Sequence, residues 1–211
     1  MAVFTFGNAY SQIDVKANLL GFAFNDYGLY GEYSISENMS AQLGVMYNRT
    51  TFNLTSTAAN ITEKRVYSGM KVIPSFRFYF GVDDPTEGFF VEPYVRFKSQ
   101  KFNGGHVKIP VDNNGNYDSH WADDNNSSTV KYEERTYSVN RSKAGFGIAF
   151  GRKWVHDSGF LFETFGGFGK NTPTKVVYSD KDVQDYYNGI ISFDNPIKIH
   201  FRIGASIGWR F

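Results

Sequence analysis

The chain has 211 residues, a net charge of +1 and no cysteine. The charge excludes a general electrostatic attraction to nucleic acid, and the absence of thiols excludes disulfides, thiol catalysis and thiolate metal sites. The sequence has no run of eighteen apolar residues, so no transmembrane helix is expected. The length suits one β domain of barrel type over residues 1–211. The 21 Phe and 14 Tyr are typical of strands whose ends lie at a membrane interface.

The N-terminus, Met1-Ala2-Val3, lacks the charged and apolar regions of a secretory signal. Two interpretations remain open at this point. The chain is either a cytosolic protein or a mature form from which an export signal has been removed. The strand pattern described below favours the second interpretation.

Alternation of apolar and polar residues predicts seven strands before the last one, because a strand points successive side chains to opposite faces. In one of them, Met70, Phe76 and Phe78 share one face, while Lys71 and Arg77 share the other. The predicted strands are residues 13–19, 29–35, 41–48, 69–80, 89–100, 143–154 and 160–168.

Two features interrupt this pattern. The alternation is lost at residues 20–24, where we expect a bulge. Pro74 and Pro93 stand inside predicted strands, and proline cannot donate a ladder hydrogen bond. We therefore expect a bulge or a missing rung at each proline.

The last strand is the clearest of the eight. Its odd positions are all apolar: Ile197, Ile199, Phe201, Ile203, Ala205, Ile207, Trp209 and Phe211. Its even positions are basic, polar or glycine: Lys198, His200, Arg202, Gly204, Ser206, Gly208 and Arg210. Such a strand fits a soluble sandwich or a transmembrane barrel with its apolar face towards lipid.

The connections between the predicted strands alternate in length. Short turns rich in Asp, Asn, Gly and Pro follow the second, fourth and sixth strands, at residues 37–40, 82–88 and 156–159. Long loops lie at about 50–66, 102–138 and 171–195. This asymmetry is typical of outer-membrane barrels. The sequence therefore predicts an all-β, eight-stranded antiparallel transmembrane β-barrel, with short periplasmic turns, long extracellular loops and periplasmic termini.

The polar faces of the predicted strands carry charges of both signs, which a soluble eight-stranded binding barrel would not place inside. We expect them to fill the bore as a network of ion pairs, because eight strands enclose room for side chains and little else. The predicted network consists of Glu32, Lys71, Arg77, Glu92, Arg96, Lys143, Glu163 and Arg202. We also expect Phe80, Phe89, Trp154, Trp209 and Phe211 to form an aromatic girdle near the periplasmic ends.

The strand ending in Trp209-Arg210-Phe211 resembles the terminal strand of bacterial outer-membrane barrels. That resemblance implies that Ile207, Trp209 and Phe211 form a signal read by the barrel assembly machinery. More narrowly, residues 17–21, 74–80, 88–96, 145–154 and 159–160 resemble a Bacteroidetes-type family of small outer-membrane barrels of unknown function, with an OmpX- or OmpA-like barrel architecture. The resemblance implies a fold and a location in the outer membrane, and no particular activity.

Three groups of residues contain the side-chain types of a chemical site. His156-Asp157-Ser158 resembles the His-x-Ser element of outer-membrane lipid A deacylases, but it falls in a predicted periplasmic turn and is good turn sequence. His106 and His120 share a loop with Asp112, Asp118, Asp123 and Asp124, without the ordered spacing of a calcium loop. We favour a hairpin turn at Asn114-Gly115 between residues 107–111 and 117–121. His200 is expected to be structural.

The sequence therefore predicts a non-enzymatic integral protein of a Gram-negative outer membrane, acting through its surface loops or as an accessory subunit of an envelope complex. A lipid-modifying enzyme and a narrow pore remain the alternatives. No cofactor, metal or nucleic acid is expected. The expected partners are outer-membrane lipid and lipopolysaccharide, the barrel assembly machinery during insertion, and, as an open alternative, other envelope proteins.

Overall fold

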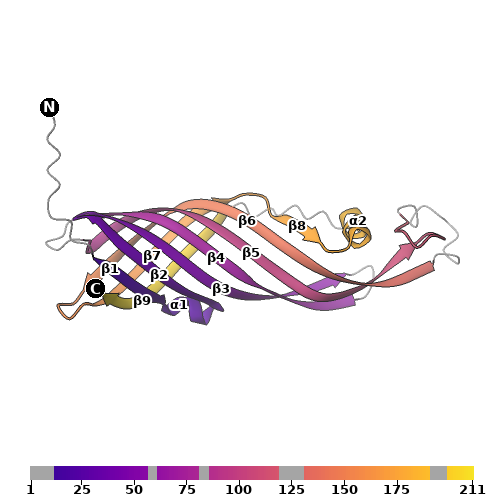
Figure 1. The fold of residues 1–211 in the computed structure, drawn as a ribbon, viewed down its shortest axis with the longest axis horizontal. Helices are drawn as coiled ribbons and strands as arrows, with labels where there is room; N and C mark the ends of the chain where they lie inside the picture. The colour runs from indigo at the N-terminus through magenta and orange to yellow at the C-terminus, as the bar shows by residue number, and fades with distance from the viewer. Residues whose placement is uncertain (1–11, 57–60, 81–85, 119–130, 191–198) are drawn as a thin grey trace, which may run out of the picture.

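The computed structural model describes residues 12–56, 61–80, 86–118, 131–190 and 199–211. Eight long strands form a closed antiparallel ring, in which each strand pairs with the next and the last pairs with the first (Figure 1). In ring order they are β1 (Ile13–Asn18), β2 (Asp26–Ser36), β3 (Met39–Ser56), β4 (Ile61–Phe80), β5 (Gly88–Val111), β6 (Lys131–Val155), β7 (Phe160–Asn171) and β9 (Ile199–Arg210). The predicted eight-stranded barrel is confirmed.

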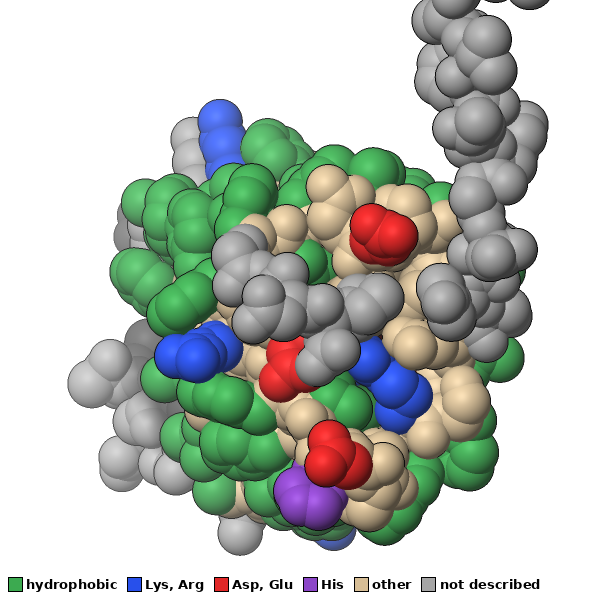
Figure 2. Space-filling model, turned by 90° about the vertical axis from the view of Figure 1, so that its left-hand side faces the viewer, with side chains coloured by type: hydrophobic (Ala, Val, Ile, Leu, Met, Phe, Trp, Pro, Cys, Tyr) green, Lys and Arg blue, Asp and Glu red, His purple; other side chains and the backbone are tan. Residues whose placement is uncertain are grey.

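The barrel is apolar on its outside and polar on its inside. Phe201 is 83% exposed and Ile203 69% exposed, while the alternate residues Ser206 and His200 of the same strand are buried. Figure 2 shows hydrophobic side chains around the rim of one end of the molecule, with charged and polar groups towards its centre. This arrangement is that of a membrane-spanning barrel, whose outer face replaces water contacts by lipid contacts.

Alternation places seven apolar residues on the faces of β4, β6 and β9 that lie opposite the charged faces. Six of them are exposed: Met70, Phe76, Phe78, Phe146, Phe201 and Ile203. The seventh, Ile148, is half-buried. The prediction that the apolar face is the outer face is therefore confirmed by the structure.

The five expected girdle residues stand at strand ends on one side of the barrel. Phe80 ends β4, Phe89 is the second residue of β5, and Trp154 is the second-last residue of β6. Trp209 and Phe211 flank the last residue of β9, and all five rings are exposed. The start of β1 lies at the same end, because Ile13 and Phe211 exchange two backbone hydrogen bonds.

Two expected loops are largely strand, which corrects the predicted boundaries 50–66 and 102–138. β3 and β4 stay paired from Arg49–Ser68 out to Ser56–Ile61. β5 and β6 stay paired out to Val111–Lys131, past a bulge between Phe102 and Gly105. Figure 1 shows these four strands extending well beyond the others. The sequence pattern failed here because strands outside a membrane need no apolar outer face.

The third expected loop, 171–195, also contains structure. Its described part includes a short strand, β8 (Lys175–Tyr178), which pairs with β6, and a helix, α2 (Lys181–Ile190). Val183 of α2 is fully buried. It belongs to a cluster that we call the aromatic cluster, which consists of Tyr67, Phe102, Tyr137, Val139, Tyr178 and Val183. Through this cluster the helix packs against the inner side of the extended strands.

The expected bulge at residues 20–24 is a short helix instead, α1 (Leu19–Ala23). Asn18 caps it, since its side-chain oxygen accepts a 3.1 Å hydrogen bond from the Gly21 amide. A side chain at Gly21 would stand 2.1 Å from the Asp26 carbonyl, so the turn into β2 requires glycine. Within the described parts of the chain, no helix is long and apolar enough to cross a membrane.

The two prolines interrupt one ladder without shifting it. The β4–β5 pairing runs from Val72–Phe97 to Ser75–Tyr94 and then to Phe78–Val91, at constant register. Pro74 and Pro93 lie at the two gaps, while their other neighbours, Leu43 and Ile148, remain in register. Each proline therefore marks a missing rung, and neither marks a bulge.

Candidate functional site

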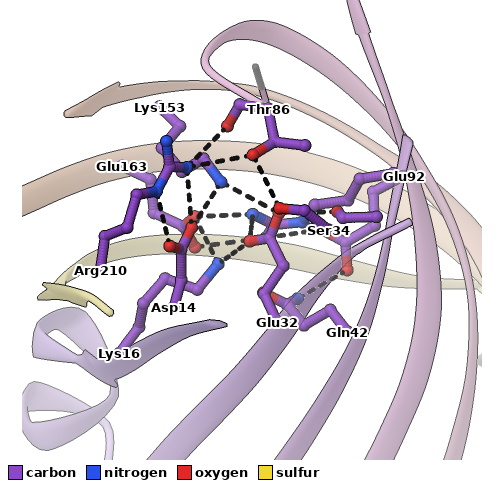
Figure 3. A network of polar contacts seen from close by, with 12 residues as sticks. Asp14, Lys16, Glu32, Ser34, Gln42, Thr86, Glu92, Lys153, Glu163 and Arg210 are labelled. Atoms are coloured by element: carbon purple, nitrogen blue, oxygen red, sulfur yellow. Dashed lines mark hydrogen bonds and ion pairs between the residues drawn. The ribbon is translucent and has the colours of Figure 1, made fainter. Parts of the chain in front are cut away.

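The inward faces of seven strands bring a dense set of charges together inside the barrel (Figure 3). We call this set the charge plug. It consists of Asp14, Lys16, Glu32, Arg77, Glu92, Lys153, Glu163, Arg202 and Arg210. Alternation on each strand places these side chains inside, and the ladder register brings them to a common region of the bore.

Arg77 on β4 is the centre of the charge plug. Its Nη1 lies 2.7 Å from Glu163 Oε2 and 3.1 Å from Glu32 Oε2, and its Nη2 lies 3.0 Å from Glu92 Oε2. The three carboxylates come from β7, β2 and β5, and Arg77 is 0% exposed. One guanidinium thus joins four strands of the barrel, β2, β4, β5 and β7, through charge-assisted hydrogen bonds.

Two lysines extend the charge plug towards the end where β1 starts. Lys16 donates to Glu32 Oε2 at 2.5 Å and to Glu163 Oε2 at 2.8 Å. Lys153 donates to Asp14 Oδ2 at 2.7 Å and to Glu32 Oε1 at 3.0 Å. Both ammonium groups are fully buried, so each replaces its lost hydration by carboxylate contacts.

The charge plug is close to electrically balanced, with four carboxylates facing five cations. Neutral groups complete it, because Ser40 and Gln42 donate to Glu32 and Glu92. Since Arg77, Glu92 and Glu163 are 0% exposed, the described residues leave no open passage at this level. The arrangement can hold the barrel together and fill the bore at this level.

The structure divides the eight predicted network residues between two levels of the bore. Glu32, Arg77, Glu92, Glu163 and Arg202 lie in the charge plug. The other three lie farther along, away from the end where Ile13 pairs with Phe211.

There Lys71 pairs with Asp26, and Arg96 donates to Asn171 Oδ1 at 2.5 Å. Lys143 has no ion pair within the described part of the chain.

Sequence reasoning did not include four members of the charge plug in the network: Asp14, Lys16, Lys153 and Arg210. All four lie on the polar faces that alternation identifies. Alternation therefore predicts that these side chains face the bore, but it does not predict their positions along the barrel axis. Register decides the height, and it pairs Asp14 with both Glu32 and Arg210.

The His156–Ser158 pair stands in a turn, as expected. His156 Nδ1 lies 3.0 Å from Ser158 Oγ and accepts a 3.2 Å hydrogen bond from the Ser158 amide. Both residues are exposed in the connection between β6 and β7, at the end where Ile13 pairs with Phe211. Among the described residues, no carboxylate bonds to His156.

The expected turn at Asn114-Gly115 is present. Asp112 Oδ1 accepts from the amides of Asn114 and Asn116, Gly115 has φ +82°, and Val111 bridges to Tyr117. The two backbone N–H groups hold the pKa of the Asp112 carboxyl below its usual value. Residues 107–111 also pair with β6. Of the predicted partner 117–121, Tyr117 and Asp118 bond to the end of β5, and residues 119–121 lie outside the described residues.

The histidines hold no metal set in the described structure. His106 lies 3.5 Å from Glu134 and is exposed, while His120, Asp123 and Asp124 lie outside the described residues. Over those described ranges, no group of three or more His, Asp and Glu side chains could hold a metal ion. His200 faces the bore, with its Nε2 2.8 Å from the Tyr94 hydroxyl.

Comparison with solved structures finds bacterial outer-membrane proteins. CarO of Acinetobacter baumannii is 8% identical, with 95% of this chain and 97% of that chain covered and a TM-score of 0.49. Ail, the attachment invasion locus protein of Yersinia pestis, is 12% identical, with 95% and 99% covered and a TM-score of 0.42. CarO2 of A. baumannii is 11% identical, with 95% and 97% covered and a TM-score of 0.41.

No curated protein matches the sequence. One family model does match, and it covers residues 1–188, which is most of the chain. The expectation of a family of unknown function is thereby confirmed. The chain belongs to the family described as protein of unknown function DUF3575.

Proposed function

We propose that this protein is a non-enzymatic integral protein of the bacterial outer membrane, which acts through the two hairpins that project from its barrel. The observation that carries the proposal is the combination of three features in one molecule. The outer wall is apolar, the bore is closed by buried ion pairs, and the β3–β4 and β5–β6 hairpins continue past the wall. A closed wall and a blocked bore leave the projecting parts as the surface on which function depends.

The orientation follows from the difference between the two ends of the barrel. Outer-membrane barrels have short turns and both termini on the periplasmic side. In this protein the short connections between β2 and β3 and between β6 and β7 lie at the end where Ile13 meets Phe211. We therefore assign that end to the periplasm and the hairpins to the cell exterior.

The hairpins are built to present a defined surface. The aromatic cluster holds α2 and β8 against the extended β5 and β6, with Tyr178 and Tyr187 stacked at 5.3 Å between ring centroids. Farther out, Tyr132 is 52% exposed on β6. Ordered, partly aromatic surfaces of this kind suit recognition of another molecule.

Cysteine labelling tests the location and the orientation, because the natural chain has no cysteine. Thr136→Cys lies on the projecting part of β6, Ser158→Cys in a turn at the opposite end, and Phe201→Cys on the apolar wall. In intact cells, a membrane-impermeant maleimide should label the first variant only. Ser158→Cys should react after the outer membrane is permeabilised. Labelling of Ser158→Cys but not Thr136→Cys in intact cells would reverse the orientation.

Photo-crosslinking tests the role of the hairpins. A photoreactive residue at Tyr132 should give discrete protein or polysaccharide adducts in native membranes. The same residue at Phe201 is the matched control, since that position should react with lipid alone. Identical adduct patterns at the two positions would contradict recognition by the hairpins.

A further inference from the structure

A row of three lysines crosses neighbouring strands inside the barrel. Lys71 on β4 is the direct ladder partner of Lys98 on β5, and Lys98 is the direct partner of Lys143 on β6. All three belong to the inward faces of their strands. Side chains directly opposite one another on a sheet lie within about 5 Å at Cβ, and like charges there destabilise the sheet.

Other cationic groups surround this row. Arg96 lies two residues before Lys98 on the same face of β5, close enough for its charge to act on Lys71, Lys98 and Lys143. We call these four residues the cationic layer: Lys71, Arg96, Lys98 and Lys143.

Only one carboxylate among the described residues faces this layer. Asp26 pairs with Lys71, and its charge also acts on Lys98 and Arg96. Within those residues, Lys98, Lys143 and Arg96 form no ion pair with a carboxylate. The charge plug is balanced, whereas the cationic layer carries an excess of about three positive charges.

Buried donors point to the same place without partners. His200 is 8% exposed and its Nδ1 has no hydrogen-bond partner. Arg202 donates to Glu92 through Nη1, but its buried Nε and Nη2 atoms donate no hydrogen bond to any described residue. Both side chains lie within electrostatic range of Lys71 and Arg96. Buried polar groups in proteins normally have hydrogen-bond partners, so these nitrogen atoms are an exception that needs an explanation.

The cationic layer is neither sealed nor fully open. The Lys71 side chain is 13% exposed, and Arg96, Lys98 and Lys143 are half-buried. On one side lie Tyr30, Tyr94 and Phe165, and on the other lies the aromatic cluster around Tyr67 and Phe102. Charges in such partly desolvated surroundings act on a ligand more strongly than charges on a wet surface.

We propose that the cationic layer binds a phosphate-type dianion, either free phosphate or the phosphate group of a small water-soluble molecule. Three ammonium groups and one guanidinium converge on one region, and a dianion with several oxygens can accept from all of them. Binding would remove the mutual repulsion of Lys71, Lys98 and Lys143. The lysines face the bore and not the lipid, so the ligand comes from the aqueous side.

The first test is titration of the purified full-length barrel with inorganic phosphate, followed by calorimetry and by the thermal unfolding midpoint. The wild-type midpoint should rise with phosphate concentration, because a ligand that binds only the folded state stabilises it. The Lys98→Gln/Lys143→Gln variant should bind phosphate about tenfold more weakly or worse. Lys101→Gln is the matched control. It removes the same charge from an exposed position on the same strand, and should bind as the wild type does.

The unliganded proteins give the second readout. If the row exists for a ligand, the double variant should unfold at the same or a higher temperature than the wild type in phosphate-free buffer, because repulsion has been removed. A lower midpoint would show that the lysines stabilise the barrel itself and would overturn the proposal. So would the absence of a phosphate-dependent shift in the wild type, or an equal shift in the double variant.

Two further experiments decide whether the ligand is free phosphate, a phosphorylated solute or a lipid phosphate. A soluble phosphate monoester that binds more tightly than inorganic phosphate indicates a larger phosphorylated solute, and equal or weaker binding indicates free phosphate. Vesicles of zwitterionic and of anionic phospholipid should give the same affinity for phosphate. Competition by the anionic lipid would overturn the assignment to a water-soluble ligand.

Discussion

Lys153 on β6 donates a 3.0 Å hydrogen bond to Glu32 on β2, the strand directly opposite in the eight-stranded ring. Both side chains are essentially inaccessible to water. The bond spans the full width of the bore, so the two walls of the barrel are tied to each other and not only to their neighbours. Arg77 and Lys16 also link strands that are not neighbours in the ring, since both bond to Glu163 on β7 from β4 and β1.

Removing the centre of the charge plug should be the most damaging single change. Arg77→Met leaves Glu32, Glu92 and Glu163 with fewer cations, and breaking a buried ion pair typically costs about 3–5 kcal/mol. Urea unfolding in lipid vesicles, followed by tryptophan fluorescence, should show the loss. Arg49→Met is the control, because Arg49 is exposed. Equal stability of the two variants would contradict a structural role for the charge plug.

Glu92→Gln should destabilise the barrel less than Arg77→Met does. Glu92 bonds to Arg202 Nη1 at 2.6 Å and to Arg77, but Arg77 keeps two other carboxylates. We expect a loss of about 1–3 kcal/mol, the usual cost of an unsatisfied buried group. The same unfolding assay measures it. A variant as stable as the wild type and carrying a continuous ion conductance in planar bilayers would instead revive the pore interpretation.

Two glycines on neighbouring strands should respond differently to an added methyl group. A Cβ at Gly204 would stand 2.1 Å from Phe165 Cζ inside the bore, whereas a Cβ at Gly166 would meet nothing within 4 Å. Gly204→Ala should therefore cost about 1–3 kcal/mol. Gly166→Ala, at the ladder partner of Ile203, should cost much less. Thermal unfolding of the two variants side by side checks this prediction, and the reverse order would refute it.

Changes at Phe211 should separate assembly from stability. The Phe211 backbone bonds to Ile13 at 2.9 and 3.2 Å, while its ring is 74% exposed. Phe211→Ala keeps those bonds, so refolding into detergent should proceed nearly as in the wild type. If the ring is part of an assembly signal, the amount inserted in cells should fall strongly. Equal losses in both assays would mean that the ring matters for the fold itself.

The turn at the end of β5 should loosen in acid. The Asp112 pKa is lower in the folded turn than in the unfolded chain, owing first to the Asn116 amide and then to the Asn114 amide. The ionised carboxylate therefore stabilises the turn above the unfolded pKa, and this contribution is lost as the pH falls through the folded pKa. Amide exchange at Asn114 and Asn116, corrected for intrinsic rates, should accelerate over that range. Asp112→Ala should abolish the pH dependence.

The fold could be predicted from the sequence to the extent that lipid imposes a pattern on it. Residues 69–80 and 199–210 alternate because one face meets hydrocarbon, and both lie in strands with the expected faces outward. Ile197 and Lys198, which the pattern also assigns to the last strand, lie outside the described residues. Where lipid ends, the pattern ends: residues 49–56 and 131–138 are strands with no apolar stripe, and reasoning from alternation took them for loops. Helix α1 was not predicted, because the loss of alternation at residues 20–24 is also what a bulge would produce.

Alternation predicts which side chains face the interior, but it does not predict which of them contact one another. Lys143 and Lys153 lie on the same face of β6, ten residues apart. One belongs to the cationic layer and the other to the charge plug, and alternation treats them alike. Only the register of strands that are distant in sequence separates them, as when the β1–β9 pairing places Asp14, the ion-pair partner of Lys153, opposite Arg210. Register depends on closure of the whole ring, which a local pattern does not contain.

The closing seam has a consequence for the order of folding. β1 is held by five residue pairs to β2 and by five to β9, and Asp14 and Arg210, which bond across that seam, are 196 residues apart in the chain. Joining such distant segments is slow, because loop entropy must be lost before any contact is gained. The β3–β4 and β5–β6 hairpins can form early from local pairings, whereas β1 can pair on both sides only after β9 is in place. Until then the sheet has two bare edges, and the groups of the charge plug have no common interior in which to meet.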